Sequence, residues 1–161
     1  MSEEITELAG GVTVASERFD HVRSAAIGWF VDVGSVDEAA DEAGYAHLLE
    51  HMLFRGTPGY SSEEIDQRFD AIGGEINAGT GKDGTSVYVR VLDTHVEEAF
   101  GIGSEMVWQP LLSDDDVAQE REIVLEEIAM YEDDPQELVF DVAAETVFGD
   151  SPLGRPVIGT R

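Results

Sequence analysis

The sequence of 161 residues contains no cysteine and very little positive charge. Without cysteine there are no disulfides and no thiolate ligands, so any metal site has to use histidine or carboxylate side chains. Nine lysines and arginines stand against 35 aspartates and glutamates, which gives a formal net charge of −26. Nucleic acid and anionic membrane surfaces attract basic faces, so we expect neither as a partner.

Long hydrophobic runs are also missing. The longest apolar run covers seven residues, 25–31, whereas a membrane-spanning helix needs about 20. Residues 1–10 contain three glutamates and no lysine or arginine, so no secretory signal is visible and we expect a cytoplasmic protein. The acidic balance fits a cytoplasm of high salt, where self-repulsion is screened, and it fits, more simply, an ordinary acidic protein.

The chain does contain enough apolar sequence for one folded domain. Apolar residues make up 42% of it, an ordinary fraction for a globular protein, and its length is typical of a single core. Alternating and helical periodicity predict an α+β fold, with a mixed or antiparallel sheet packed against helices. The expected strands are 12–16, 23–33, 75–80 and 84–92, and the expected helices are 43–54, 62–72, 94–107, 114–132 and 136–147, followed by a loop over 149–161.

The most informative segment is the sequence His-Leu-Leu-Glu-His at 47–51. His47 and His51 are four residues apart, about one helical turn, so both imidazoles can reach one metal ion. Glu50 lies beside them, where it can hold a water molecule instead of the metal. Apolar residues gather on the other side of this helix; they are Tyr45, Leu48, Leu49, Met52 and Leu53. Such a histidine pair is also common on a solvated face, so spacing alone leaves metal binding open.

A hydrolytic zinc site takes three protein ligands and keeps one position for water, so the third ligand has to come from elsewhere. In the helix expected over 114–132, Glu120 and Glu127 lie about 20° apart on the helical wheel, at the edge of an apolar stripe. Glu122 and Glu126 point away from that stripe, which consists of Val117, Val124, Ile128 and Tyr131. A carboxylate directed into a core needs a partner, so either Glu120 or Glu127 can face the histidine helix.

Four segments resemble the pitrilysin/insulinase family of zinc peptidases, closest to the branch of mitochondrial processing peptidase and its bacterial relatives. His-x-x-Glu-His is the inverted zincin signature. The matching segments are 44–57 (GYAHLLEHMLFRGT), 73–80 (GGEINAGT), 120–128 (EREIVLEEI) and 152–160 (PLGRPVIGT), which span nearly the whole chain in the family's order. The resemblance implies the fold of that family's metalloenzyme domain and the activity of a zinc metalloendopeptidase.

The resemblance also implies a role for each polar residue of the two helices. His47 and His51 would bind Zn2+, and Glu127, 76 positions after His51, would be the third ligand. Glu50 would be the general base that takes a proton from water and passes it to the leaving amine. Glu120 would be an auxiliary acid near the site.

The segment 73–80 resembles the active-site edge strand of the family. There Asn77 and Ala78 would hold an extended peptide substrate as an added strand, through its main chain. The family's working unit is longer, so residues 1–161 correspond to an N-terminal zinc-binding peptidase domain whose C-terminal part and second domain are missing. The remainder of the chain or a homologous subunit would close the chamber, and apolar surface meant for it is expected to be exposed.

Two other functions compete with that of a peptidase. The family contains non-catalytic subunits, and this chain could be such a partner subunit or a binding module. Those members typically lose part of the HxxEH motif or the distant glutamate, whereas the whole set is present here: His47, Glu50, His51 and Glu127. The other alternative is an acidic scaffold with a fortuitous histidine pair, and the order of the four segments argues against it.

Overall fold

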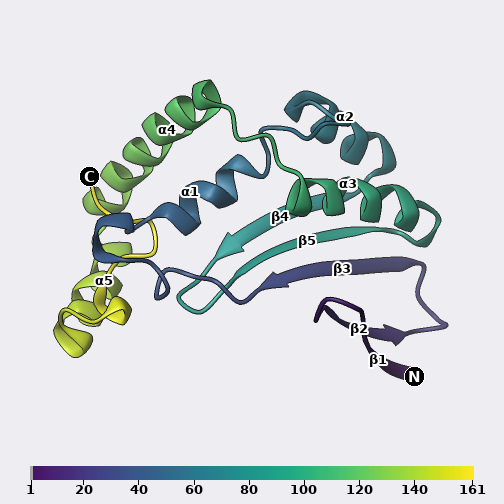
Figure 1. The fold of residues 1–161 in the computed structure, drawn as a ribbon, viewed down its shortest axis with the longest axis horizontal. Helices are drawn as coiled ribbons and strands as arrows, with labels where there is room; N and C mark the ends of the chain where they lie inside the picture. The colour runs from purple at the N-terminus through teal and green to yellow at the C-terminus, as the bar shows by residue number, and fades with distance from the viewer. Residues whose placement is uncertain (1) are drawn as a thin grey trace.

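The centre of the structure is a three-stranded antiparallel sheet in the order β3-β5-β4 (Figure 1). The structure is a computed structural model that describes residues 2–161. The strands of this sheet are β3 (Ser24–Val31), β4 (Glu75–Thr80) and β5 (Thr85–Leu92). β4 and β5 form the hairpin predicted from the sequence. Because β5 is the middle strand, β3 and β4 are the two edges of the sheet.

One face of the sheet is covered by two helices, α2 (Ser62–Ile72) and α3 (Val96–Trp108), and the hydrophobic core lies between them and the strands. Val89 and Val91 of β5 belong to this core. The helices contribute Ile65, Phe69, Ala99, Ile102 and Met106. The opposite face of the sheet carries exposed apolar side chains, which are Phe30, Tyr88 and Leu92. The α+β class predicted from the sequence is confirmed.

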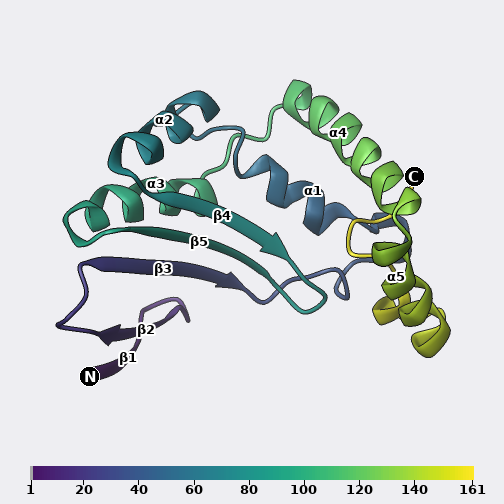
Figure 2. The same cartoon turned by 180° about the vertical axis from the view of Figure 1, so that it is seen from behind.

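A second region contains three helices, α1 (Tyr45–Met52), α4 (Asp114–Asp133) and α5 (Pro135–Phe148). α1 contacts β4 on one side and α4 on the other, and α4 leads directly into α5 (Figures 1 and 2). The final segment contains one 3-10 turn, Pro152–Gly154, and otherwise has the loop conformation predicted for it. It returns from α5 to the start of α1, so the two ends of this region lie side by side.

Strand β1 (Ser2–Glu7) was not predicted from the sequence. This strand pairs with β2 (Thr13–Arg18) in a separate two-stranded sheet. Three of its six residues are glutamates, and residues 3–7 are all exposed. Neither burial nor hydrophobic alternation marks such a strand, because it is held by main-chain pairing with its neighbour.

The apolar side predicted for α1 is only partly buried. Met52 and Leu53 are buried, but Tyr45 is 62% exposed and Leu49 is 48% exposed. The helices and strands that α1 contacts most are β4 and α4, and they leave these two side chains exposed. Periodicity located the apolar side correctly and did not indicate how much of it the other elements cover.

The apolar stripe predicted for α4 needs the same correction. Val124 and Ile128 are buried, whereas Val117 and Tyr131, which lie nearer the two ends of the helix, are 36% and 45% exposed. Exposed apolar side chains are also frequent on α5, where the residues more than half exposed are Val139, Phe140, Val142 and Val147. The expectation of exposed apolar surface is therefore confirmed. Among the described residues, no helix combines the length and the apolar character that crossing a membrane requires.

Candidate metal centre

The two histidines of α1 lie one above the other on the side of the helix that is closest to α4. The centroids of the His47 and His51 rings are 4.7 Å apart, and the side chains are only 17% and 19% exposed. The helix over residues 43–54 was predicted from the sequence, and it forms over Tyr45–Met52. One helical turn therefore gives the two rings the proximity that their spacing predicted.

Glu127 of α4 completes a group of three ligands. Its Oε2 atom lies 3.9 Å from Nε2 of His47 and 3.6 Å from Nε2 of His51. Ligand atoms about 2.0–2.1 Å from a tetrahedral zinc ion are roughly 3.3–3.5 Å from one another, so these distances need to shorten by only a few tenths of an ångström. Among residues 2–161, this is the one group of three histidines and carboxylates whose ligand atoms converge within 4.8 Å. The donor set, two imidazoles and one carboxylate, suits zinc.

The surroundings of His47 also suit the binding of a cation. Burial, and then the neighbouring His51, lower the pKa of His47 below its ordinary value, against the opposing effect of nearby carboxylates. A lower pKa favours the neutral imidazole, which is the form that coordinates a metal. His47 is therefore suited to bind a metal ion.

Glu120 approaches the same histidine pair from its other side. The carboxylate is buried, with 5% of the residue exposed, and its Oε2 atom lies 2.9 Å from Nδ1 of His51. Its other oxygen is paired with the guanidinium of Arg55. Glu127 thus faces the Nε2 atoms, whereas Glu120 faces the Nδ1 atom of one ring, so only Glu127 is placed to share an ion with both rings. The ion pair between Arg55 and Glu120 was not predicted from the sequence, although a buried carboxylate generally needs a cation as its partner.

The inward direction of the two glutamates agrees with their position on the helical wheel. Glu120 is buried and Glu127 half-buried, whereas Glu122 and Glu126 are exposed. The sequence left open which of the first two would meet the histidines, and the structure brings both to α1. Their separation by two helical turns places them on opposite sides of the histidine rings.

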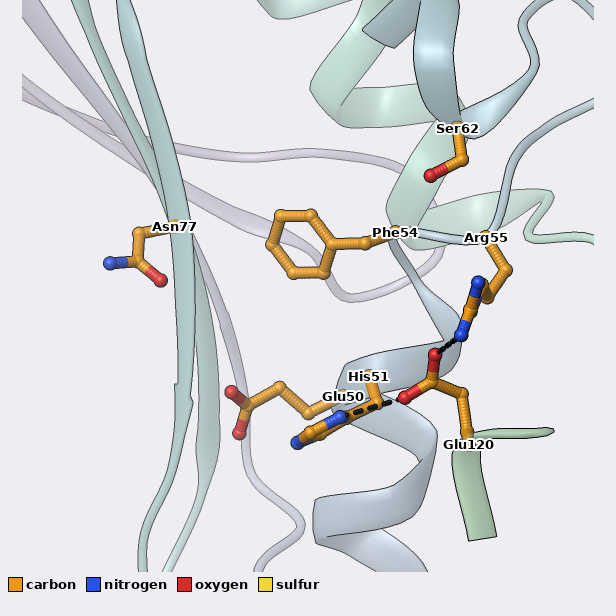
Figure 3. A pocket seen from close by; sticks show the side chains of 7 residues that line it. All are labelled: Glu50, His51, Phe54, Arg55, Ser62, Asn77 and Glu120. Atoms are coloured by element: carbon orange, nitrogen blue, oxygen red, sulfur yellow. Dashed lines mark hydrogen bonds and ion pairs between the residues drawn. The ribbon is translucent and has the colours of Figure 1, made fainter. Parts of the chain in front are cut away.

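Glu50 extends from α1 toward the sheet. Its Oε2 atom accepts a hydrogen bond of 2.5 Å from Oγ1 of Thr80, the last residue of β4. This role of Thr80 was not predicted, because no local sequence pattern indicates a contact between residues 30 positions apart. A cavity of about 360 Å3 opens beside these groups; it is lined by Glu50, His51, Phe54, Arg55, Ser62, Asn77 and Glu120 (Figure 3).

Asn77 and Ala78 lie on β4, next to this cavity. β4 is an edge of the sheet, and among the described residues it pairs only with β5. Oδ1 of Asn77 accepts a hydrogen bond of 2.9 Å from the main-chain N–H of Ala78. Among the described residues β4 therefore has one unpaired edge, and the hydroxyl of its last residue, Thr80, contacts the carboxylate of Glu50.

Comparison with known proteins supports the same family as the motifs. The family model described as Insulinase (Peptidase family M16) matches residues 13–161. An uncharacterized zinc protease of Mycobacterium leprae is 48% identical over 155 residues, which cover 96% of this chain and 35% of that protein. An uncharacterized zinc protease of Bacillus subtilis is 39% identical over 150 residues, which cover 93% of this chain and 37% of that protein. The chain thus spans little more than a third of the length of these relatives.

Two solved structures share the fold. The crystal structure of a protease from Helicobacter pylori has a TM-score of 0.93 and 24% identity, and the match covers 99% of this chain and 39% of that chain. The inactive M16 peptidase domain from Pseudomonas fluorescens has a TM-score of 0.87 and 22% identity, with the same coverage. Identities this low show a common fold and nothing about activity. The family match over residues 13–161 shows that the chain belongs to the insulinase family, peptidase family M16.

Proposed function

We propose that this chain is the zinc-binding part of a metalloendopeptidase that hydrolyses peptide bonds in extended peptides. The observation that carries the proposal is the convergence of His47, His51 and Glu127, with Glu50 beside them. Relatives named zinc proteases support the choice of metal and of reaction. When bound, zinc supplies a Lewis acid that lowers the pKa of water toward about 7 and polarises the carbonyl of the scissile bond.

Glu50 is the general base in this proposal. Its carboxylate lies on the same helix as both histidines and remains outside the ligand group, so it is free to exchange a proton. It takes a proton from the attacking water and gives it to the nitrogen of the leaving amine. The hydrogen bond from Thr80 fixes one carboxylate oxygen, which leaves the other for this transfer.

Glu120 and Arg55 hold the ring of His51 in this proposal. A carboxylate on the Nδ1 atom of a ligating histidine fixes the tautomer in which Nε2 is free to bind the metal. Arg55 balances the charge of Glu120, which is otherwise buried. The sequence-based role of Glu120 as an auxiliary acid stays a prediction; its contacts favour a positioning role, because both oxygens are already occupied.

The substrate in this proposal is an extended peptide that pairs with the free edge of β4 at Asn77 and Ala78. Main-chain pairing recognises the backbone and leaves the side chains weakly specified. Because the relatives are nearly three times as long, we assign the closure of the site to the remainder of a longer chain or to a homologous subunit.

The test combines metal analysis with peptide cleavage by the full chain. Glu50→Gln keeps the size of the side chain and all three ligands, so we expect one zinc per chain and no cleavage of an unstructured fluorogenic peptide. Full cleavage by this variant would exclude Glu50 as the base. Absence of zinc from the unmodified chain, after loading with one equivalent, would overturn the proposed function itself.

A non-catalytic partner subunit is the second candidate, because one structural neighbour is an inactive M16 domain with a TM-score of 0.87. The complete set of ligands and base favours the peptidase. The two functions differ in one result: a partner subunit binds no zinc or binds it without cleaving any peptide, and restores activity only when a catalytic homologue is added.

A further inference from the structure

The C-terminal segment is in direct main-chain contact with the start of the histidine helix. Gly44, the residue before α1, and Gly159 both have positive φ angles, of 99° and 88°. A Cβ atom on Gly44 would lie 2.8 Å from the carbonyl oxygen of Ile158, and one on Gly159 would lie 2.6 Å from that of Ala43. No side chain fits between the two segments, so the path of the tail and the entry into α1 depend on each other.

Two cations fix this contact. Nη2 of Arg155 donates a hydrogen bond of 2.8 Å to the main-chain carbonyl of Glu38, and Nζ of Lys82 donates to the carbonyl of Arg155 itself. Lys82 is in the turn between β4 and β5. Although the chain has 35 acidic residues, neither cation forms an ion pair with a carboxylate in the part of the chain that the structure describes. Both cations hold main-chain groups in place instead.

The residue held by Arg155 is the cap of the histidine helix. The carboxylate of Glu38 accepts hydrogen bonds from the main-chain N–H groups of Gly44, at 2.9 Å, and Ala46, at 2.7 Å. Gly44 has no side chain to cap α1, and a carboxylate is favoured at a helix N-terminus, where N–H groups lack partners. Glu38 therefore fixes the first turn of α1, directly before His47.

His47 depends on this turn more than His51 does. Nδ1 of His51 is held by Glu120, whereas Nδ1 of His47 is buried and has no hydrogen-bond partner among the described residues. No side chain of the described structure therefore orients the ring of His47 through a hydrogen bond at Nδ1. Its place is set by the main chain of α1, which begins at the cap formed by Glu38.

We propose that Arg155 is a positioning residue for the metal centre: by holding the main chain of Glu38 it fixes the carboxylate cap of α1 and, through it, the place of His47 relative to Glu127. Lys82 supports Arg155 from the turn that follows β4, so the tail, the hairpin and the ligand helix form one connected unit. This inference rests on the proposed zinc site, and it adds to that site a residue 104 positions after His51, the end of the ligand motif.

The test measures zinc affinity by competition with a chromophoric chelator, in the full chain. Arg155→Ala is expected to weaken zinc binding by about tenfold, the lower end of the range for partners of ligating side chains. Loss of a positive charge by itself would favour a cation, so a weaker affinity reports a change in position. The matched control is Arg161→Ala, which removes the same charge from the same tail, where Arg161 forms an exposed ion pair of 2.7 Å with Glu132; its affinity should stay within about twofold of the wild type.

A conservative variant and a metal-free readout separate positioning from general destabilisation. Arg155→Lys keeps a donor for the carbonyl of Glu38, so it should restore most of the affinity lost in Arg155→Ala. In metal-free protein, hydrogen exchange at the amides of Gly44 and Ala46 should be faster in Arg155→Ala and unchanged in Arg161→Ala. If Arg155→Ala does not fold, Lys82→Met, which releases the carbonyl of Arg155, should weaken zinc binding by about threefold.

Wild-type affinity and wild-type exchange in Arg155→Ala would overturn the inference, as would wild-type affinity in Lys82→Met if that variant has to be used. Failure of the proposed function would give a different set of results in these measurements. An unmodified chain that binds no zinc overturns the metal site, while exchange at Gly44 and Ala46 still shows whether Arg155 controls the start of α1.

Discussion

The half of the molecule that contains β5, α2 and α3 is held by a cluster of buried apolar side chains, whereas the half that contains α1 and α4 combines fewer buried apolar side chains with buried polar contacts. In the first half, Val89, Ile102 and Met106 are at most 1% exposed. In the second, a buried residue of α4 is a glutamate, Glu120, and α5 has no buried residue at all. Apolar packing determines whether the chain folds, and a few long-range hydrogen bonds determine how the site is arranged. Substitutions in the two halves should therefore have separable effects.

The largest effect on the site is expected from removal of a ligand. His51→Ala leaves one imidazole and one carboxylate, too few for a stable zinc site, so the variant should lose stoichiometric zinc while it remains folded. Metal analysis after gel filtration measures this, with far-UV circular dichroism as the check on folding. His21→Ala, which removes an exposed histidine from a turn, is the control and should retain zinc. Stoichiometric zinc in His51→Ala would place the metal elsewhere.

The largest effect on folding is expected in the apolar half. Val89→Ala removes two methyl groups from a residue that is fully buried, so the free energy of unfolding should fall by about 2–3 kcal/mol. Val147→Ala, on α5, makes the same change where the residue is 73% exposed, and should cost less than about 0.5 kcal/mol. Urea denaturation of both variants measures the difference. Equal losses would show that α5 is covered in solution.

A smaller effect on the site is expected from Glu120→Gln. The amide keeps the shape of the side chain but leaves Arg55 without a counter-charge and weakens the hold on His51, so zinc affinity should fall by about 10- to 100-fold. Glu122→Gln removes the same charge from the exposed side of α4 and controls for electrostatics. Chelator competition gives both affinities. If the two variants lose affinity equally, Glu120 acts only through its charge.

The smallest effect is expected from Thr80→Val, which has nearly the same shape and lacks the hydroxyl. Loss of the hydrogen bond to Glu50 should lower kcat for peptide cleavage by about tenfold, the scale of one bond to a charged group, and leave zinc affinity unchanged. Thr13→Val, in the exposed strand β2, is the control for the substitution. A parallel loss of zinc would show that Thr80 supports the helix rather than the carboxylate.

Residues whose interactions lie within one helical turn were predicted from the sequence, whereas partners that are distant in the sequence were not. His47, Glu50 and His51 are within one turn of one helix, so spacing alone predicted that they share a face. The partners of two of them, Thr80 and Glu120, are 30 and 69 positions away. Periodicity showed that Glu120 faces inward, but nothing in it indicated Arg55 as its counter-ion. Contacts of that kind depend on how separate elements pack.

The elements of the fold also divide into those that local sequence patterns predict and those that depend on distant partners. The hairpin of β4 and β5 and the helices α2 and α3 follow from alternation, helical spacing and glycines, all of which act over a few residues. Strand β1 was missed because its side chains are exposed and its stability comes from its partner strand. Periodicity placed Tyr45 and Leu49 together on the apolar side of α1 but did not indicate that both would be exposed.

The sequence by itself determined the α+β class, the helical turn that pairs His47 with His51 and the two inward glutamates of α4, because local periodicity fixes which side chains share a face. Only the tertiary structure decided that Glu127 lies near the Nε2 atoms of the histidines, whereas Glu120 contacts Nδ1 of His51. It also decided that Arg155 binds the main chain of Glu38, the residue that caps α1. Those contacts depend on the packing of segments up to 117 positions apart in the sequence, and a local sequence pattern contains no information about such contacts.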